Sequence, residues 1–167
     1  MSLSLDIAAA LRPLVGQTFL PARTVSATDA GVTIALDVLS VEMLGVSCEE
    51  LRLDVPALTG ASINQLKQWA AGLCQRITYL LEPLGPLEFD AQNQQVLIRS
   101  QPPDAATSPG HTKYYEVLLS ALGGGRFLLR RYQADRGVPG RQPVPIRVTH
   151  EQLAKLVNDL VATLPTP

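Results

Sequence analysis

The chain has 167 residues and a mass of 18.0 kDa, which fits one globular domain and is too short for two ordinary ones. Charged residues make up 17% and hydrophobic residues 46%, so the chain can fill a core and is not disordered as a whole. The net charge of −1 excludes a global attraction to nucleic acid or to an anionic membrane, and no apolar run reaches the length of a membrane span. We therefore expect a single soluble domain over residues 1–167.

The first part of the chain predicts one helix followed by a hairpin. Residues 3–14 place apolar side chains near helical spacing. Residues 23–27 and 32–38 alternate between apolar and polar side chains and predict two strands. The turn-forming residues 28–31 join them. The pattern of residues 39–49 is ambiguous between helix and loop.

A short strand over residues 51–55 leads to the clearest element, a long central helix over residues 62–81. Ser62 and Gln65 fit the capping box, in which two side chains satisfy backbone N–H groups at the start of a helix. Apolar side chains then recur at steps of three and four. We favour a core face for this stripe, and the alternative is a contact with a second subunit through Ile63, Leu66, Leu73, Ile77 and Leu80.

The second half predicts hairpins. Residues 87–90 pair with 94–99, and residues 113–122 pair with 126–134. Such short spacings favour an antiparallel meander over a parallel sheet. Residues 101–112 are rich in proline, serine and glycine and predict an exposed, flexible loop.

The chain ends with a short strand over residues 145–148, a second capping box at Thr149 and Gln152, and a last helix. The whole order predicts an α+β fold, an antiparallel meander of hairpins packed against a long central helix plus N- and C-terminal helices. This order is similar to that of small dimeric α+β chaperones of bacterial secretion. The resemblance is one of layout and includes no matching residues.

The residue types that carry catalysis or bind metals are few and lie apart. Cys48 and Cys74 belong to no CxxC pair, and His111 and His150 have no other ligand near them in sequence. We therefore expect no metal site and no cofactor. The glycines at 123–125 precede a strand, which fits a tight hairpin and not a phosphate loop. These observations favour a protein that is not an enzyme.

Charge is divided unevenly between the two halves. Residues 1–90 carry ten acids and five bases, and residues 91–167 carry nine bases and five acids. Alternation along residues 126–134 sends Arg130 and Arg131 to opposite faces of the sheet. We favour a solvated face that pairs with the acidic first half. The alternatives are recognition of an acidic partner or subunit, and binding of a small anion, through Arg126, Arg130, Arg131, Tyr132, Arg136 and Arg141.

The sequence as a whole therefore favours a non-enzymatic protein-interaction or assembly domain, chaperone-like and homodimeric. The alternative is a domain or enzyme that binds a small anionic ligand through the arginine-rich hairpin and loop 126–141. Nucleic acid is the least favoured partner, and no membrane partner is expected. Residues 1–6 contain no basic segment of a secretory signal, so we expect a cytoplasmic location.

Overall fold

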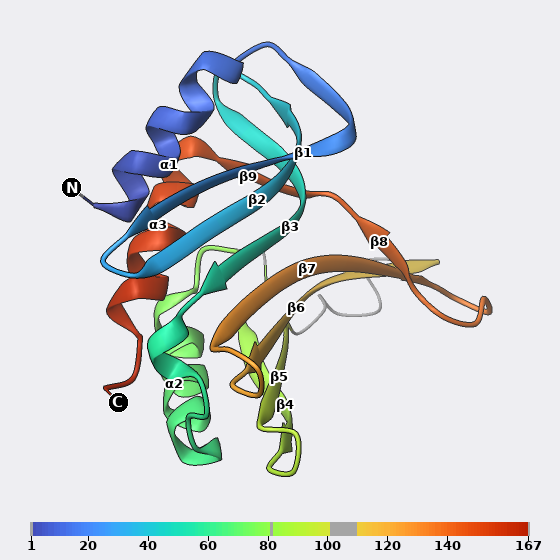
Figure 1. The fold of residues 1–167 in the computed structure, drawn as a ribbon. Helices are drawn as coiled ribbons and strands as arrows, with labels where there is room; N and C mark the ends of the chain where they lie inside the picture. The colour runs from blue at the N-terminus through green and yellow to red at the C-terminus, as the bar shows by residue number, and fades with distance from the viewer. Residues whose placement is uncertain (1, 81, 101–109, 167) are drawn as a thin grey trace.

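The computed structural model describes residues 2–80, 82–100 and 110–166. Within these ranges the chain forms three α-helices and a nine-stranded antiparallel sheet (Figure 1). The α+β class and the antiparallel sheet that the sequence predicts are thus confirmed. In chain order the elements are α1 (Leu3–Leu11), η1 (Arg12–Leu14), β1 (Thr18–Asp29), β2 (Val32–Val41), β3 (Gly45–Asp54), η2 (Pro56–Leu58), α2 (Ile63–Arg76), β4 (Leu84–Asp90), β5 (Gln95–Ser100), β6 (His111–Ser120), β7 (Arg126–Asp135), β8 (Gln142–Val144), β9 (Ile146–Thr149) and α3 (His150–Ala162).

The sheet has the strand order β1-β2-β3-β7-β6-β5-β4. β3 and β7 pair only where β3 ends, from Leu51 to Asp54, and where β7 begins, from Arg126 to Leu129. Before Leu51 in β3 and after Leu129 in β7 the two strands no longer pair with each other. We call this region the split. The second half of β7 pairs with β8, and the first half of β3 pairs with β9. The chain from β8 to β9 thus crosses from one part of the sheet to the other (Figure 1).

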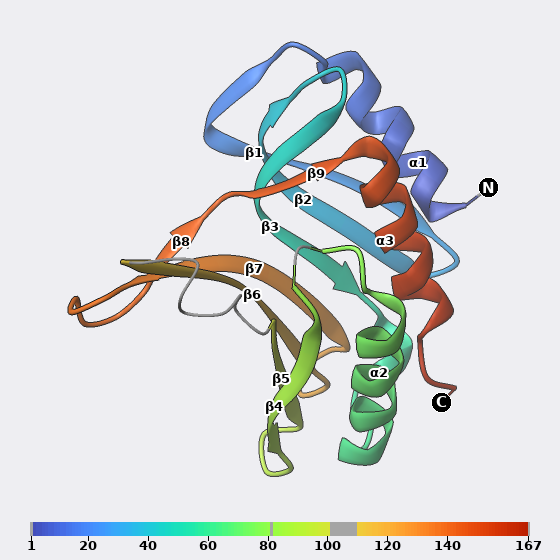
Figure 2. The ribbon, with the colours of Figure 1, turned by 180° about the vertical axis from the view of Figure 1, so that it is seen from behind.

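The helices cover one face of this sheet. α1 packs on β1 and β2, α3 packs on β3 and β9, and α2 packs on β4, β5 and β6. Figure 2 shows α3 in front of the end of β2. Trp69 of α2 lies in the core beside Phe127 of β7, with ring centroids 6.4 Å apart. The opposite side, which we call the open face, carries the side chains that point away from the helices.

The long central helix of the prediction is wrong in its length. α2 has 14 residues and ends at Arg76, although apolar spacing continues beyond it. Ile77 has φ −86° and ψ 85°, which is outside the helical region, and the N–H of Thr78 binds the carbonyl of Arg76. Ile77 and Leu80 are nevertheless buried, so they reach the core from a non-helical segment. Helical spacing of buried side chains therefore extended the prediction past the real end of the helix.

Both predicted capping boxes are confirmed. At α2, the Ser62 N–H binds Gln65 Oε1 at 2.9 Å, and the Gln65 N–H binds Ser62 Oγ at 3.2 Å. At α3, the Thr149 N–H binds Gln152 Oε1 at 3.0 Å, and the Gln152 N–H binds Thr149 Oγ1 at 3.0 Å. These bonds satisfy backbone donors that lack partners within the helix. Local sequence therefore fixes where both helices begin.

The ambiguous residues 39–49 are mainly strand. β2 continues through Val41, and β3 begins at Gly45 after a short connection. Gly45 packs directly against β9, where an added Cβ would lie 2.5 Å from the carbonyl oxygen of Val148. The long-range contact with β9 thus decides this segment, and no pattern among its own neighbours reveals it.

The predicted flexible loop 101–112 falls largely on residues 101–109, which lie outside the described residues. Gly110 forms a turn, and His111 and Thr112 already belong to β6. His111 therefore stands at the start of a strand, opposite Asp135 of β7.

Among the described residues, no helix has the length and apolar character needed to cross a membrane.

Candidate interaction and anion-binding sites

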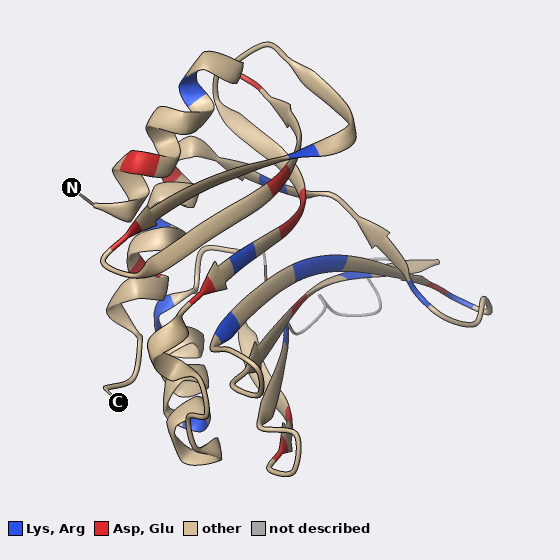
Figure 3. Cartoon of the chain, viewed as in Figure 1, with Lys and Arg blue, Asp and Glu red and all other residues tan. Residues whose placement is uncertain are grey.

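Three of the predicted site arginines lie on the open face and are paired with carboxylates. Arg126 Nε is 2.7 Å from Asp54 Oδ1, and Arg130 Nη2 is 2.6 Å from Glu50 Oε2. Arg141, from the connection between β7 and β8, pairs with Glu116 of β6. Figure 3 shows charges of both signs along β3 and β7. The basic charge of these arginines is therefore balanced within the chain.

The ion pairs continue across β3 to β2. Arg52 Nη1 lies 2.8 Å from both Asp37 Oδ2 and Glu50 Oε1. Thr24 of β1 also donates a hydrogen bond to Asp37 Oδ1 at 2.8 Å. The hydrogen bond from Arg52 is the main cause that lowers the pKa of Asp37, with Thr24 and nearby positive charge adding to it and burial opposing it. Asp37 is thus held in its charged form.

Aromatic side chains hold the loop after β7 against the open face. The rings of Tyr114 and Tyr132 lie 5.9 Å apart. The Arg141 guanidinium stacks 3.8 Å from the centre of the Tyr132 ring, and that of Arg99 lies 4.7 Å from Tyr114. Cation–π contacts of this kind favour arginine over lysine. Arg136 is exposed in the turn after β7, apart from this stack.

Arg131 points to the other face, as strand alternation predicts. Its side chain is 9% exposed, and its Nη2 lies 3.6 Å from Oε1 of Glu82, just before β4. The Arg131 guanidinium also lies 4.3 Å from the centre of the Tyr115 ring. The sheet therefore divides the predicted site residues, and they do not form one arginine cluster.

A second group of cations meets around Arg131. A pocket of about 320 Å³ is lined by Lys113, Tyr115, Arg131, Val144, Pro145 and Arg147. Sequence reasoning missed Lys113 and Arg147 as site residues. The available signal was weak, since Arg147 closes the arginine-rich stretch and Lys113 belongs to the strand predicted to pair with that of Arg131. Pairing of β6 with β7, together with the pairing of β9 with β3, brings these residues to the same pocket.

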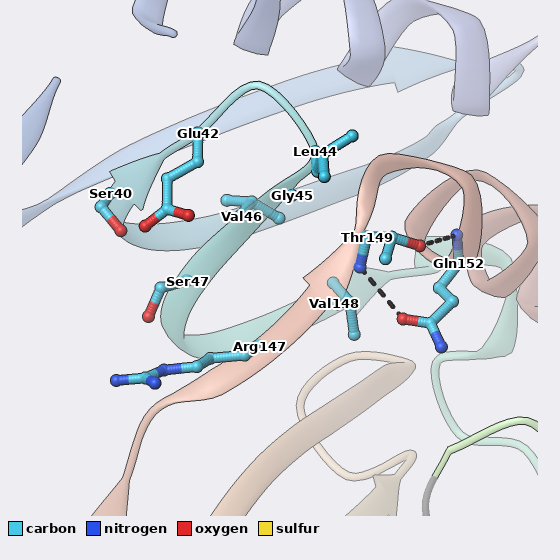
Figure 4. Close-up of a pocket in the computed structure, with 10 residues that line it drawn as sticks. All are labelled: Ser40, Glu42, Leu44, Gly45, Val46, Ser47, Arg147, Val148, Thr149 and Gln152. Atoms are coloured by element: carbon cyan, nitrogen blue, oxygen red, sulfur yellow. Dashed lines mark hydrogen bonds between the residues drawn. The ribbon is translucent and has the colours of Figure 1, made fainter. Parts of the chain in front are cut away.

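A larger pocket of about 410 Å³ lies between the β2–β3 hairpin and the start of α3 (Figure 4). Ser40, Glu42, Ser47 and Arg147 lie along one side of it. The hydrogen bonds drawn there are those of the capping box between Thr149 and Gln152. Nearby, a ring nitrogen of His150 is 2.8 Å from the carbonyl oxygen of Glu42. These contacts organise the start of α3 and assemble no nucleophile with a base.

The predicted subunit-contact residues lie inside the chain's own core. Leu66, Leu73 and Ile77 are at most 1% exposed, Leu80 is 5% exposed, and Ile63 is partly buried. This agrees with the core face that the pattern favoured. Because these side chains are already packed within one chain, a contact with a second copy has to use another surface.

The main strand order ends at β1 and β4, while the short strands β8 and β9 each pair with one strand beside it. β4 has seven residues, contains Pro86, and shifts its register against β5 between Pro86 and Glu88. β1 has 12 residues and shifts its register against β2 between Thr18 and Arg23. From Arg23 to Asp29 its pairing with β2 is regular. β1 therefore presents a regularly paired edge strand over seven residues.

Comparison with protein-family models, with curated proteins and with solved structures finds no match to this chain. Within the described residues, no group of three or more His, Cys, Asp and Glu side chains is placed to hold a metal ion.

Proposed function

We propose that this protein is a non-enzymatic interaction domain that forms a homodimer by antiparallel pairing of two β1 strands. The observation that carries this proposal is the regular outer edge of β1 from Arg23 to Asp29. The backbone N–H and C=O groups on such an edge are a template for another strand. Pairing two copies would join their sheets into one.

Protection against such pairing is uneven along the sheet. Proline, irregular register and short length are features that block strand addition. β4 has a proline and an irregular register, and the first part of β1 has Pro21 and a register shift. The segment from Arg23 to Asp29 has no proline, and its residues Thr24, Ser26 and Thr28 are exposed. This segment is therefore the more accessible of the two ends of the main strand order.

The sequence of this edge is complementary to itself. Antiparallel pairing about Ser26 places Arg23 opposite Asp29 of the second copy, and Asp29 opposite its Arg23. Thr24 then faces Thr28 of the second copy, and Val25 faces Ala27. Opposite charges and paired threonines each stabilise neighbouring strands by about 0.2–1 kcal/mol. A twofold symmetric dimer repeats each of these pairs twice, apart from the central serines.

The experiment is the solution mass by light scattering over a range of protein concentrations. We expect a dimer of twice 18.0 kDa. Ser26→Lys places two lysines face to face on the twofold axis and should yield monomers, because like charges directly opposite repel. Gln92→Lys adds the same charge in the exposed β4–β5 turn and should leave the dimer intact.

A monomer at every concentration would overturn the proposal, as would a dimer that Ser26→Lys leaves unchanged. Circular dichroism of each variant checks that its sheet is folded. An assembly or chaperone-like role for the dimer and a cytoplasmic location stay predictions of the sequence.

A further inference from the structure

Three cationic residues from three strands line the pocket of about 320 Å³ beside the split, and one of them, Arg147, also lines the larger pocket of Figure 4. Lys113 comes from β6, Arg131 from β7 and Arg147 from β9. We propose that this pocket, which we call the cationic pocket, binds a phosphate group. It lies apart from the β1 edge in the sheet order, so the inference is independent of the proposed dimer.

Arg131 supplies the buried donor of this site. A guanidinium has five N–H donors. Arg131 is 8% exposed, and its Nη1 is buried without a hydrogen-bond partner among the described residues. Its nearest carboxylate oxygen, on Glu82, is 3.6 Å from Nη2, which is longer than a normal hydrogen bond. Leaving such a donor unsatisfied is costly, and an anion in the cationic pocket would satisfy it.

Neighbouring groups fix the position of that donor. The Tyr115 ring, itself 2% exposed, lies against the guanidinium at 4.3 Å. Glu82, which is 7% exposed, faces Nη2 of the same guanidinium. The guanidinium is thus held in place before any ligand arrives, which lowers the entropy cost of binding.

The charge at the cationic pocket is not balanced as it is on the open face. There, Arg126, Arg130 and Arg141 each meet a carboxylate. Among the described residues, one carboxylate lies within ion-pair distance of a pocket cation. It is that of Glu82, and the cation is Arg131. Three positive charges against one negative charge favour a ligand with two negative charges. A phosphate group carries about this charge at neutral pH, and arginine matches its oxygens in pairs.

The volume of the cationic pocket bears on the source of that phosphate group. About 320 Å³ falls within the range of small-molecule sites, which is roughly 300–1,000 Å³. Val144 and Pro145 provide an apolar wall beside the cations. Free phosphate and the phosphate group of a small organic ester share the same recognition chemistry. The apolar wall would add contacts only for the ester.

Isothermal titration calorimetry of the full chain tests the proposal with inorganic phosphate and with phenyl phosphate at constant ionic strength. Lys113→Gln and Arg147→Gln change exposed side chains and should each weaken binding about ten-fold, the effect of losing one charge-assisted hydrogen bond. Arg12→Gln is the matched control, because it removes an exposed cation in η1, outside the pocket, and should leave the affinity unchanged.

The outcomes are distinct. Tighter binding of phenyl phosphate supports the site and assigns it to an ester, while equal binding supports it and assigns it to free phosphate. If phosphate produces no more heat than chloride does, the proposal is overturned. An equal loss of affinity in all three variants would also overturn it, since that result indicates attraction to net charge alone. Unchanged melting temperatures without phosphate show that the variants are folded.

Discussion

Glu50 of β3 bridges two arginines with its two carboxylate oxygens. Its Oε2 accepts a hydrogen bond from Nε of Arg130 on β7 at 2.8 Å and lies 2.6 Å from Nη2 of the same guanidinium. Its Oε1 accepts one from Arg52 Nη1 at 2.8 Å. Glu50 stands at the split, just beyond the last paired residue Leu51. A single side chain thus ties the two parts of the sheet together where their backbones separate.

Replacing this bridge should destabilise the protein modestly. Glu50→Gln removes two ion pairs, but the Arg130 side chain is half exposed and Arg52 keeps Asp37 as a partner. We expect a loss of about 1 kcal/mol in the free energy of unfolding, measured by urea denaturation. Glu49→Gln changes the adjacent, exposed carboxylate and serves as the control. Equal effects of both variants would show that the bridge contributes nothing specific.

The pH dependence of stability should report on Asp37. Its pKa in the folded protein lies below the ordinary value of 3.8, mainly because Arg52 donates a hydrogen bond to the carboxylate. The unfolded chain therefore binds the proton first as the pH falls. The stabilisation from Asp37 is complete well above pH 3.8 and is lost as the pH drops through the folded pKa.

Asp37→Asn is the variant for this measurement. It should lower the free energy of unfolding at neutral pH and reduce the further loss below about pH 4. Unfolding curves recorded at closely spaced pH values compare it with the unmodified protein. Parallel pH profiles for the two proteins would contradict the assignment.

The charges at the ends of the β1 edge allow a charge-exchange test of the dimer. Arg23→Glu and Asp29→Arg should each weaken the dimer, because every variant then places like charges opposite each other at two positions. The double variant restores opposite charges and should recover the dimer. Sedimentation equilibrium measures the dissociation constants. If the double variant loses as much dimerisation free energy as the two single variants lose together, the pairing about Ser26 is excluded.

The two cysteines should differ in reactivity. Cys48 is fully buried in β3, and burial raises its pKa to about 12. Cys74 of α2 is only partly buried, although burial raises its pKa as well. Since the thiolate is the reactive form and needs access, a thiol reagent at pH 8 should modify Cys74 slowly and Cys48 only after unfolding. Mass spectrometry of the labelled peptides tests this order. Rapid labelling of Cys48 in the folded protein would contradict its burial.

The sequence determined the local structure of this protein. Alternating side chains marked most strands, and the paired side chains of the capping boxes marked the starts of α2 and α3. Alternation along β7 also placed Arg130 and Arg131 on opposite faces. These features depend on residues a few positions apart, so the interactions that create them are visible in a short window of sequence.

The tertiary structure alone decided the rest. The end of α2 at Arg76 escaped prediction because Ile77 and Leu80 keep helical spacing while reaching the core from a non-helical segment. The pairing of β3 with both β7 and β9 joins segments far apart in the chain. That pairing gives Arg126 and Arg130 their carboxylates and brings Arg147 to the pocket that Arg131 lines. Strand order and register depend on packing over the whole core, and no local pattern contains that information.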